Sequence, residues 1–123
     1  MAQFLVLVDA EPDGWRVDRD ALTVAIRDRW ADVGIDSTRY SKARSFCWSF
    51  ATGNGPGEAY LHEDGTCLYV DALLEDAAQL AISFRRLTPP DVDVVFCDEG
   101  YTFDIRLRPG VTDGDLADLV NSA

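Results

Sequence analysis

Long hydrophobic runs are missing from this chain. The longest uninterrupted apolar stretch is FLVLV at residues 4–8, and no Lys or Arg precedes it. A membrane-spanning helix needs about 20 apolar residues, and a signal peptide needs a basic segment ahead of its apolar core. The stretch instead has the length of a buried strand. We therefore expect a soluble, cytoplasmic protein.

Cysteine is also scarce. The three residues, Cys47, Cys67 and Cys97, are an odd number at wide spacings, and no Cys-x-x-Cys motif occurs. This pattern argues against the disulfide framework of a small secreted domain. It predicts free, buried thiols in a reducing compartment.

Positive charge is the third deficit. The chain has 11 Lys and Arg against 22 Asp and Glu, a formal net charge of −11, and Lys42 is the single lysine. Such a surface repels phosphate backbones and anionic lipid, so we expect neither nucleic acid nor membrane as a partner. A basic protein is the partner that this charge favours. The alternative is that the acidity serves solubility alone.

One short segment departs from this acidity. RYSKAR, at residues 39–44, is the only local basic island. We interpret it as an edge strand whose Lys and Arg discourage sheet-to-sheet association. Binding of an anion or of a partner's acid is the alternative.

The patterning that is present predicts one domain of 123 residues, 47% of them hydrophobic. Asp18 is placed to cap a helix over 19–33 that Gly34 would end, and Thr112 with Asp115 forms a capping box at the start of the last helix. The predicted class is α+β, with a mostly antiparallel sheet of about six strands and three helices largely on one side. The element order is β-α-β(β)-β-β-α-β-β-α, read from strands at 3–9, within 35–52, 58–71 and 92–107, and from helices at 19–33, 72–87 and 113–121.

A first hairpin is predicted around Asp64-Gly65, a favoured two-residue turn. This turn pairs four residues on each strand: His62 with Cys67, Leu61 with Leu68, Tyr60 with Tyr69, and Ala59 with Val70. Because side chains alternate along a strand, the leucines, Ala59 and Val70 share one face, which we assign to the core. The other face then carries Tyr60, Tyr69, His62 and Cys67, flanked by Glu58 and Asp71.

A second hairpin is predicted with Glu99-Gly100 as its two turn residues, flanked by Asp98 and Tyr101. On one face the predicted pairs are Phe96–Phe103, Val94–Ile105 and Val92–Leu107, and on the other they include Cys97–Thr102 and an Asp93–Arg106 ion pair. A register shift of one residue would mix the two faces.

Two groups of residues could carry chemistry. His62 and Cys67 are cross-strand neighbours and could bind zinc or act as a nucleophilic pair. Glu63, however, points to the opposite face and Asp64 belongs to the turn. The acids at 91–99 could bind Mg²⁺ or serve in hydrolysis, but Asp98 and Glu99 point apart as neighbours in a strand. We expect no catalytic residue, metal or cofactor from these patterns.

The remaining candidate is a binding surface. Tyrosine is favoured at protein interfaces because it buries a large area and keeps a polar tip. We predict that Tyr60, His62, Tyr69, Glu58 and Asp71 bind a partner. The alternative is that a helix covers this face and that the tyrosines belong to the core.

In size, acidity and α+β content the chain resembles the bacterial immunity proteins of polymorphic toxin systems, although no motif carries residues over. The resemblance implies a small protein-binding module that occludes a basic toxin or enzyme. One alternative is a small enzyme or metal-binding protein using His62, Cys67 and the acids of 91–99. A second is a homodimeric subunit whose aromatic face meets its own copy.

Overall fold

Seven strands and three helices make up the protein in the computed structural model, which describes residues 4–8, 15–42, 44–100 and 102–121. In chain order they are β1 (Phe4–Val8), α1 (Arg19–Arg29), β2 (Gly34–Asp36), β3 (Phe46–Thr52), β4 (Gly55–Leu61), β5 (Cys67–Asp71), α2 (Leu74–Leu87), β6 (Val94–Asp98), β7 (Asp104–Leu107) and α3 (Asp113–Asn121). None of the helices in these ranges is long and apolar enough to cross a membrane.

All seven strands join one sheet, in the order β2-β3-β4-β5-β1-β6-β7, and every neighbouring pair is antiparallel. The first strand therefore lies between β5 and β6, as expected for a run that is apolar on both faces. The predicted α+β class and element order are confirmed, with seven strands in place of about six. The described residues of RYSKAR, 39–42 and 44, lie in the loop between β2 and β3, so the interpretation of this segment as an edge strand is wrong.

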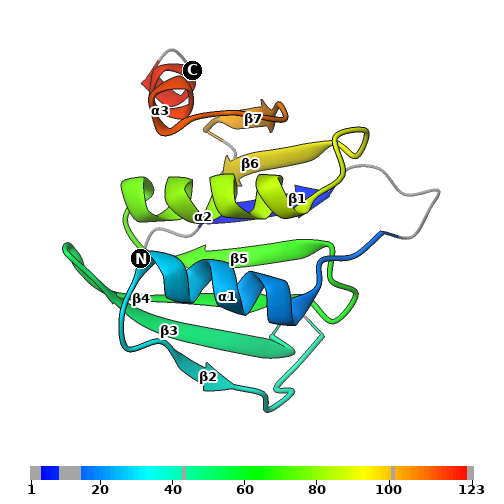
Figure 1. Ribbon diagram of the computed structural model, residues 1–123, viewed down its shortest axis with the longest axis vertical. Coiled ribbons are helices and arrows are strands. Elements are labelled where there is room, and N and C mark those ends of the chain that lie inside the picture. The colour runs from blue at the N-terminus through cyan, green and yellow to red at the C-terminus, as the bar shows by residue number, and fades with distance from the viewer. Residues whose placement is uncertain (1–3, 9–14, 43, 101, 122–123) are drawn as a thin grey trace.

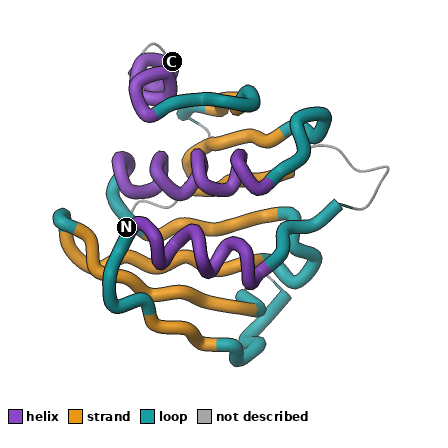
Figure 2. The backbone as a smooth tube through the Cα atoms, viewed as in Figure 1, coloured by secondary structure: helices purple, strands orange, loops and turns teal. Residues whose placement is uncertain are grey.

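The three helices lie on one side of the sheet (Figure 1). Helices α1 and α2 run next to each other, roughly along the direction of the strands, and α3 lies at the β7 edge of the sheet; Figure 2 shows the same arrangement, with helices in purple and strands in orange. Their apolar stripes, including Leu22 and Ile26 of α1 and Leu80 and Phe84 of α2, are fully buried. They pack on Trp48, Leu61 and the other inward-facing residues of the sheet.

Helix α1 begins as predicted but ends early. The Asp18 side chain accepts a hydrogen bond from the Asp20 amide at 2.9 Å, which caps the first turn. The helix stops at Arg29 rather than at residue 33, and Gly34 opens β2 instead of ending α1. Trp30 is already extended, and its ring stacks on Phe50 at 4.5 Å between centroids. Aromatic stacking and β2 pairing thus replace the last predicted helical turn. Helix α2 likewise starts two residues later than predicted, at Leu74, whereas α3 has the predicted bounds.

The first hairpin has the predicted register. Leu61 pairs with Leu68, Tyr60 with Tyr69, and Ala59 with Val70, and the His62 amide bonds the Cys67 carbonyl at 2.9 Å. The turn itself is longer than two residues, because the Gly65 amide donates to the His62 carbonyl and Gly65 has a φ of 73°. Only glycine adopts this conformation without strain.

The second hairpin has the predicted faces but not the predicted register. Phe96 pairs with Ile105 and Val94 with Leu107, a shift of two residues from the predicted pairs. The Asp98 carboxylate accepts hydrogen bonds from the Thr102 amide and hydroxyl, which widens the loop beyond a two-residue turn. A shift of two residues keeps every side chain on its predicted face of the sheet. Phe96 and Phe103 therefore still pack against each other in the core, at 5.4 Å between ring centroids. The predicted Asp93–Arg106 ion pair forms at 2.9 Å, although the strand partner of Arg106 is Val95. Tyr101, which was predicted to flank the turn, lies outside the described residues.

Candidate functional site

The sheet face opposite the helices, called the open face below, carries the predicted patch. Helices α1, α2 and α3 all pack on the other face, so the alternative of a helix that covers Tyr60 and Tyr69 is wrong for the described part of the chain. One cross-strand row of the open face runs over all seven strands: Asp36, Cys47, Tyr60, Tyr69, Leu5, Cys97 and Asp104. The neighbouring row consists of Cys67, Leu7, Val95 and Arg106.

The open face is therefore apolar at its centre and charged at its ends. Leu5, Leu7 and Val95 of the central strands are half-buried, although they point away from the core. Asp36 and Asp104 end the long row on the two edge strands. An apolar centre with a polar rim is the usual anatomy of a protein interface.

The two predicted tyrosines form one rigid unit. The rings of Tyr60 and Tyr69 stack at 5.2 Å between centroids with 17° between their planes. The Arg44 guanidinium lies 5.3 Å from the Tyr60 ring centroid and 3.5 Å from the Glu58 carboxylate. Sequence reasoning missed Arg44 because residue 44 meets Tyr60 only once β3 and β4 are paired.

Glu58 and Asp71 place two carboxylates side by side on the open face. They are direct cross-strand partners on β4 and β5, where like charges repel. One carboxylate oxygen of Asp71, Oδ1, is buried and has no hydrogen-bond partner in the part of the chain that the structure describes. A buried acceptor left unsatisfied is costly, and a cationic donor would relieve it.

His62 lies at the margin of this patch. Its Nδ1 is 3.0 Å from the Asp64 carboxylate within the β4–β5 turn. Backbone pairing with Cys67 is present, but the ring faces the turn. Across the described residues, no group of three or more His, Cys, Asp and Glu side chains is close enough to hold a metal ion.

The thiol of Cys67 is poorly suited to nucleophilic attack. Burial raises its pKa to about 12, even though the Tyr69 hydroxyl partly stabilises the thiolate. Burial also raises the pKa of Cys47 and of Cys97. A thiol that stays protonated at neutral pH is a weak nucleophile and a weak metal ligand.

We expect Cys67 to resist alkylation in the native protein. At about pH 8, the raised pKa leaves roughly 1,000-fold less thiolate than an ordinary cysteine has, so labelling should be at least about a hundredfold slower. The measurement is the iodoacetamide rate of a Cys47→Ala/Cys97→Ala variant, native and in denaturant. Native labelling as fast as in denaturant would support the alternative of a small enzyme.

Two of the acids of 91–99 have partners within their own hairpin. Asp93 pairs with Arg106, and Asp98 binds Thr102. The hydrogen bond from the Thr102 hydroxyl holds the pKa of Asp98 below its usual range. Asp91 and Glu99 are exposed in turns on either side of β6.

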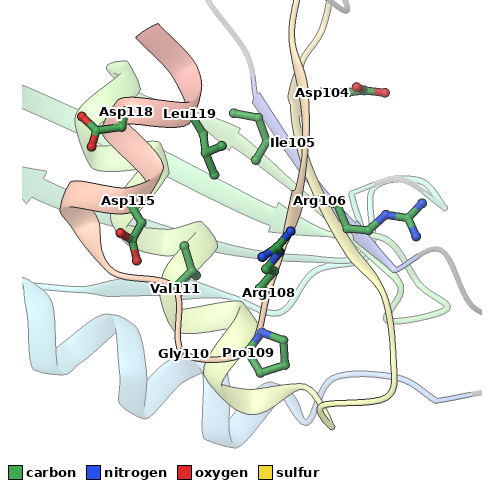
Figure 3. A pocket seen from close by; sticks show the side chains of 10 residues that line it. All are labelled: Asp104, Ile105, Arg106, Arg108, Pro109, Gly110, Val111, Asp115, Asp118 and Leu119. Carbon is green, nitrogen blue, oxygen red and sulfur yellow. The ribbon is translucent and has the colours of Figure 1, made fainter. Parts of the chain in front are cut away.

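A shallow groove between β7 and α3 was not predicted from the sequence. It has a volume of about 850 Å³, and Ile105 and Leu119 point toward each other across it, while Arg106 points away (Figure 3). One of its carboxylates, Asp115, caps α3 by accepting from the Thr112 amide. The other charged residues that line it are Asp104, Arg108 and Asp118.

Comparisons with protein-family models, with curated proteins and with solved structures found no match to this chain. The function is therefore inferred from the geometry of the open face.

Proposed function

We propose that this chain is a protein-binding module whose open face docks on a basic protein partner. In this proposal it acts as an immunity-type inhibitor, which occludes the working surface of a toxin or enzyme. The observation that carries the proposal is the stacked Tyr60–Tyr69 pair, which lies in an apolar row on a sheet face that no described helix covers.

Charge favours a basic partner over a second copy of this chain. The net charge of −11 repels a like chain, whereas a basic protein is attracted from a distance. Among the described residues of the open face, Asp36, Glu58, Asp71 and Asp104 accompany Arg44 and Arg106. Carboxylates around the apolar rows would steer the encounter, and burial of the tyrosines would supply affinity.

The acidic pair suggests one specific contact. A partner Arg or Lys placed against Asp71 would offset the repulsion between the carboxylates of Asp71 and Glu58. The neighbouring Tyr69 ring would offer the same cation an aromatic surface. Arg44 already makes the equivalent contact on the other side, over Tyr60.

The test combines capture with kinetics. The wild-type protein is used to isolate partners from the native lysate, and each captured protein is then purified and its binding measured. We expect a basic partner whose association rate falls steeply between about 0.01 M and about 1 M salt, because the Debye length shrinks about tenfold over that range. Tyr60→Ala and Tyr69→Ala should each weaken the Kd by about 30-fold, mainly through faster dissociation.

Val24→Ala is the matched control, because Val24 is 59% exposed on α1, on the helical side of the sheet. This variant should bind like the wild type. A salt-independent association rate, or full affinity in both tyrosine variants, would refute the proposal. A dimer in gel filtration that the tyrosine variants disrupt would replace the basic partner with a second copy.

A further inference from the structure

A second hollow is formed by segments that lie at the right-hand end of the sheet in Figure 1. The segment before α1, the β2–β3 loop and the β4–β5 turn meet there and enclose about 470 Å³. Its charged lining consists of three arginines and one carboxylate: Arg16, Arg19, Arg39 and Glu63. In a chain with twice as many acidic as basic residues, this is a concentrated positive site.

Each arginine is held by a different contact. The stem of Arg16 packs directly over Gly65, so closely that a Cβ on this glycine would lie 2.7 Å from the Arg16 Cβ. The Arg19 guanidinium lies 4.8 Å from the centroid of the Phe46 ring. Arg39 donates two hydrogen bonds to Glu63 Oε2, at 3.0 and 2.5 Å. Each arginine thus has a packing or hydrogen-bond contact within the protein.

Two of these cations lack a counter-charge. In the ranges that the structure describes, neither Arg16 nor Arg19 has a carboxylate within ion-pair distance, and neither guanidinium donates a hydrogen bond. Arg39, in contrast, is neutralised by its ion pair with Glu63. Stacking on Phe46 covers the face of the Arg19 guanidinium and leaves its N–H edge for an acceptor.

We propose that this hollow binds a small phosphate group, either inorganic phosphate or the phosphate of a small monoester. Arg16 and Arg19 would donate to its oxygens, because planar guanidinium groups match phosphate geometry. His62 and Ser45 also line the hollow and could add further donors. The acidic surface around the site excludes long polyanions such as nucleic acid but admits a small anion. His62 lies at the margin of the proposed partner surface as well, but Arg16 and Arg19 lie outside that surface, so this site does not depend on it.

The experiment is an NMR titration of the full chain with inorganic phosphate and, separately, with glycerol phosphate, at ionic strength held constant with chloride. Two or three charge-assisted hydrogen bonds correspond to a Kd of about 1 mM or tighter. We expect saturable shifts of the Val17, Ser45 and Gly65 amides, which line the hollow. If both probes bind with equal affinity, the site recognises the phosphate group alone. If glycerol phosphate binds more tightly, its organic part also contacts the protein.

Arg16→Gln and Arg19→Gln should each weaken phosphate binding by about tenfold, since each removes a charged donor. Arg27→Gln is the control, because it makes the same change of net charge at an exposed position elsewhere on α1. We expect its Kd to stay within about twofold of the wild type.

Three results would overturn the proposal: no saturation by either probe, shifts that map away from the three amides, or equal weakening by Arg27→Gln. The amide map of the wild type decides the location even if an arginine variant fails to fold. Loss of protein-partner binding is not a readout of this site, so the two proposals fail independently.

Discussion

Replacing Trp48 with alanine is expected to lower the free energy of unfolding by about 4 kcal/mol. The Trp48 side chain is fully buried between the sheet and α1, and it packs edge-on against Phe46 at 4.9 Å between ring centroids. Its indole Nε1–H donates to the Thr23 hydroxyl at 2.8 Å, and that hydroxyl donates in turn to the Arg19 carbonyl. Alanine would leave a large cavity and break this chain of hydrogen bonds.

Urea denaturation measures this effect, and two milder variants separate its parts. Trp48→Phe keeps most of the volume and should cost about 1–2 kcal/mol for the lost hydrogen bond and the imperfect fit. Thr23→Val leaves the indole N–H without its acceptor, at a similar cost. The double variant should cost less than the sum of the two, because both remove the same bond. A Trp48→Ala protein within about 1 kcal/mol of the wild type would contradict the described core.

Replacing Arg85 with methionine is expected to cost about 3 kcal/mol. Arg85 is only 3% exposed, and its guanidinium holds the connection from α2 to β6 through backbone carbonyls. Nη1 donates to the Val92 carbonyl at 2.6 Å, and Nη2 donates to the Pro89 carbonyl at 2.7 Å and to the Thr88 carbonyl at 3.5 Å. Methionine fills the stem volume but removes the guanidinium donors of the Val92 and Thr88 carbonyls, while the Pro89 carbonyl keeps its hydrogen bond from the Val92 amide at 3.0 Å.

The adjacent Arg86 is exposed and provides the matched control. Arg86→Met should change stability by no more than about 0.5 kcal/mol, as surface substitutions usually do. Arg85→Lys should be intermediate, since one ammonium cannot reproduce the fork of the guanidinium. If Arg85→Met unfolds at the same urea concentration as Arg86→Met, the carbonyl clamp contributes nothing.

These stability predictions bear on function because the same strands form the core and the open face. Along β4, Ala59 and Leu61 are buried against the helices, while Tyr60 between them points to the open face. The position of Tyr60 is therefore set by the packing of its neighbours on the other side of the sheet. This preorganisation limits the entropy lost when a partner binds.

The first hairpin was predictable because its determinants are local. An Asp-Gly turn and two strands with alternating side chains lie within residues 58–71. The turn fixed which residues pair, and the alternation fixed which of them face the core. The second hairpin shows the limit of this reasoning. Its alternation predicted the two faces correctly, but the Asp98–Thr102 hydrogen bonds set a wider loop and moved the register by two. A shift of two leaves the hydrophobic pattern unchanged, so the pattern could not detect it.

The end of α1 was missed for a related reason. Apolar residues recur at helical spacing from residue 19 up to Val33, but the residues after Arg29 pack outside the helix. Trp30 stacks on Phe50, twenty positions away, and the chain then enters β2. Tertiary packing overrides a weak local preference in such places.

By itself, the sequence determined the class of the fold, the sides of the two hairpins that meet the core, and a surplus of carboxylates. Those properties follow from alternation along the chain and from charge, which are local or additive. Only the tertiary structure decided that β1 lies between β5 and β6, that all three helices leave the open face uncovered, and that Arg16, Arg19 and Arg39 meet at one hollow. These outcomes depend on contacts between distant segments, whose loop-closure cost is repaid only by the packing of the whole domain.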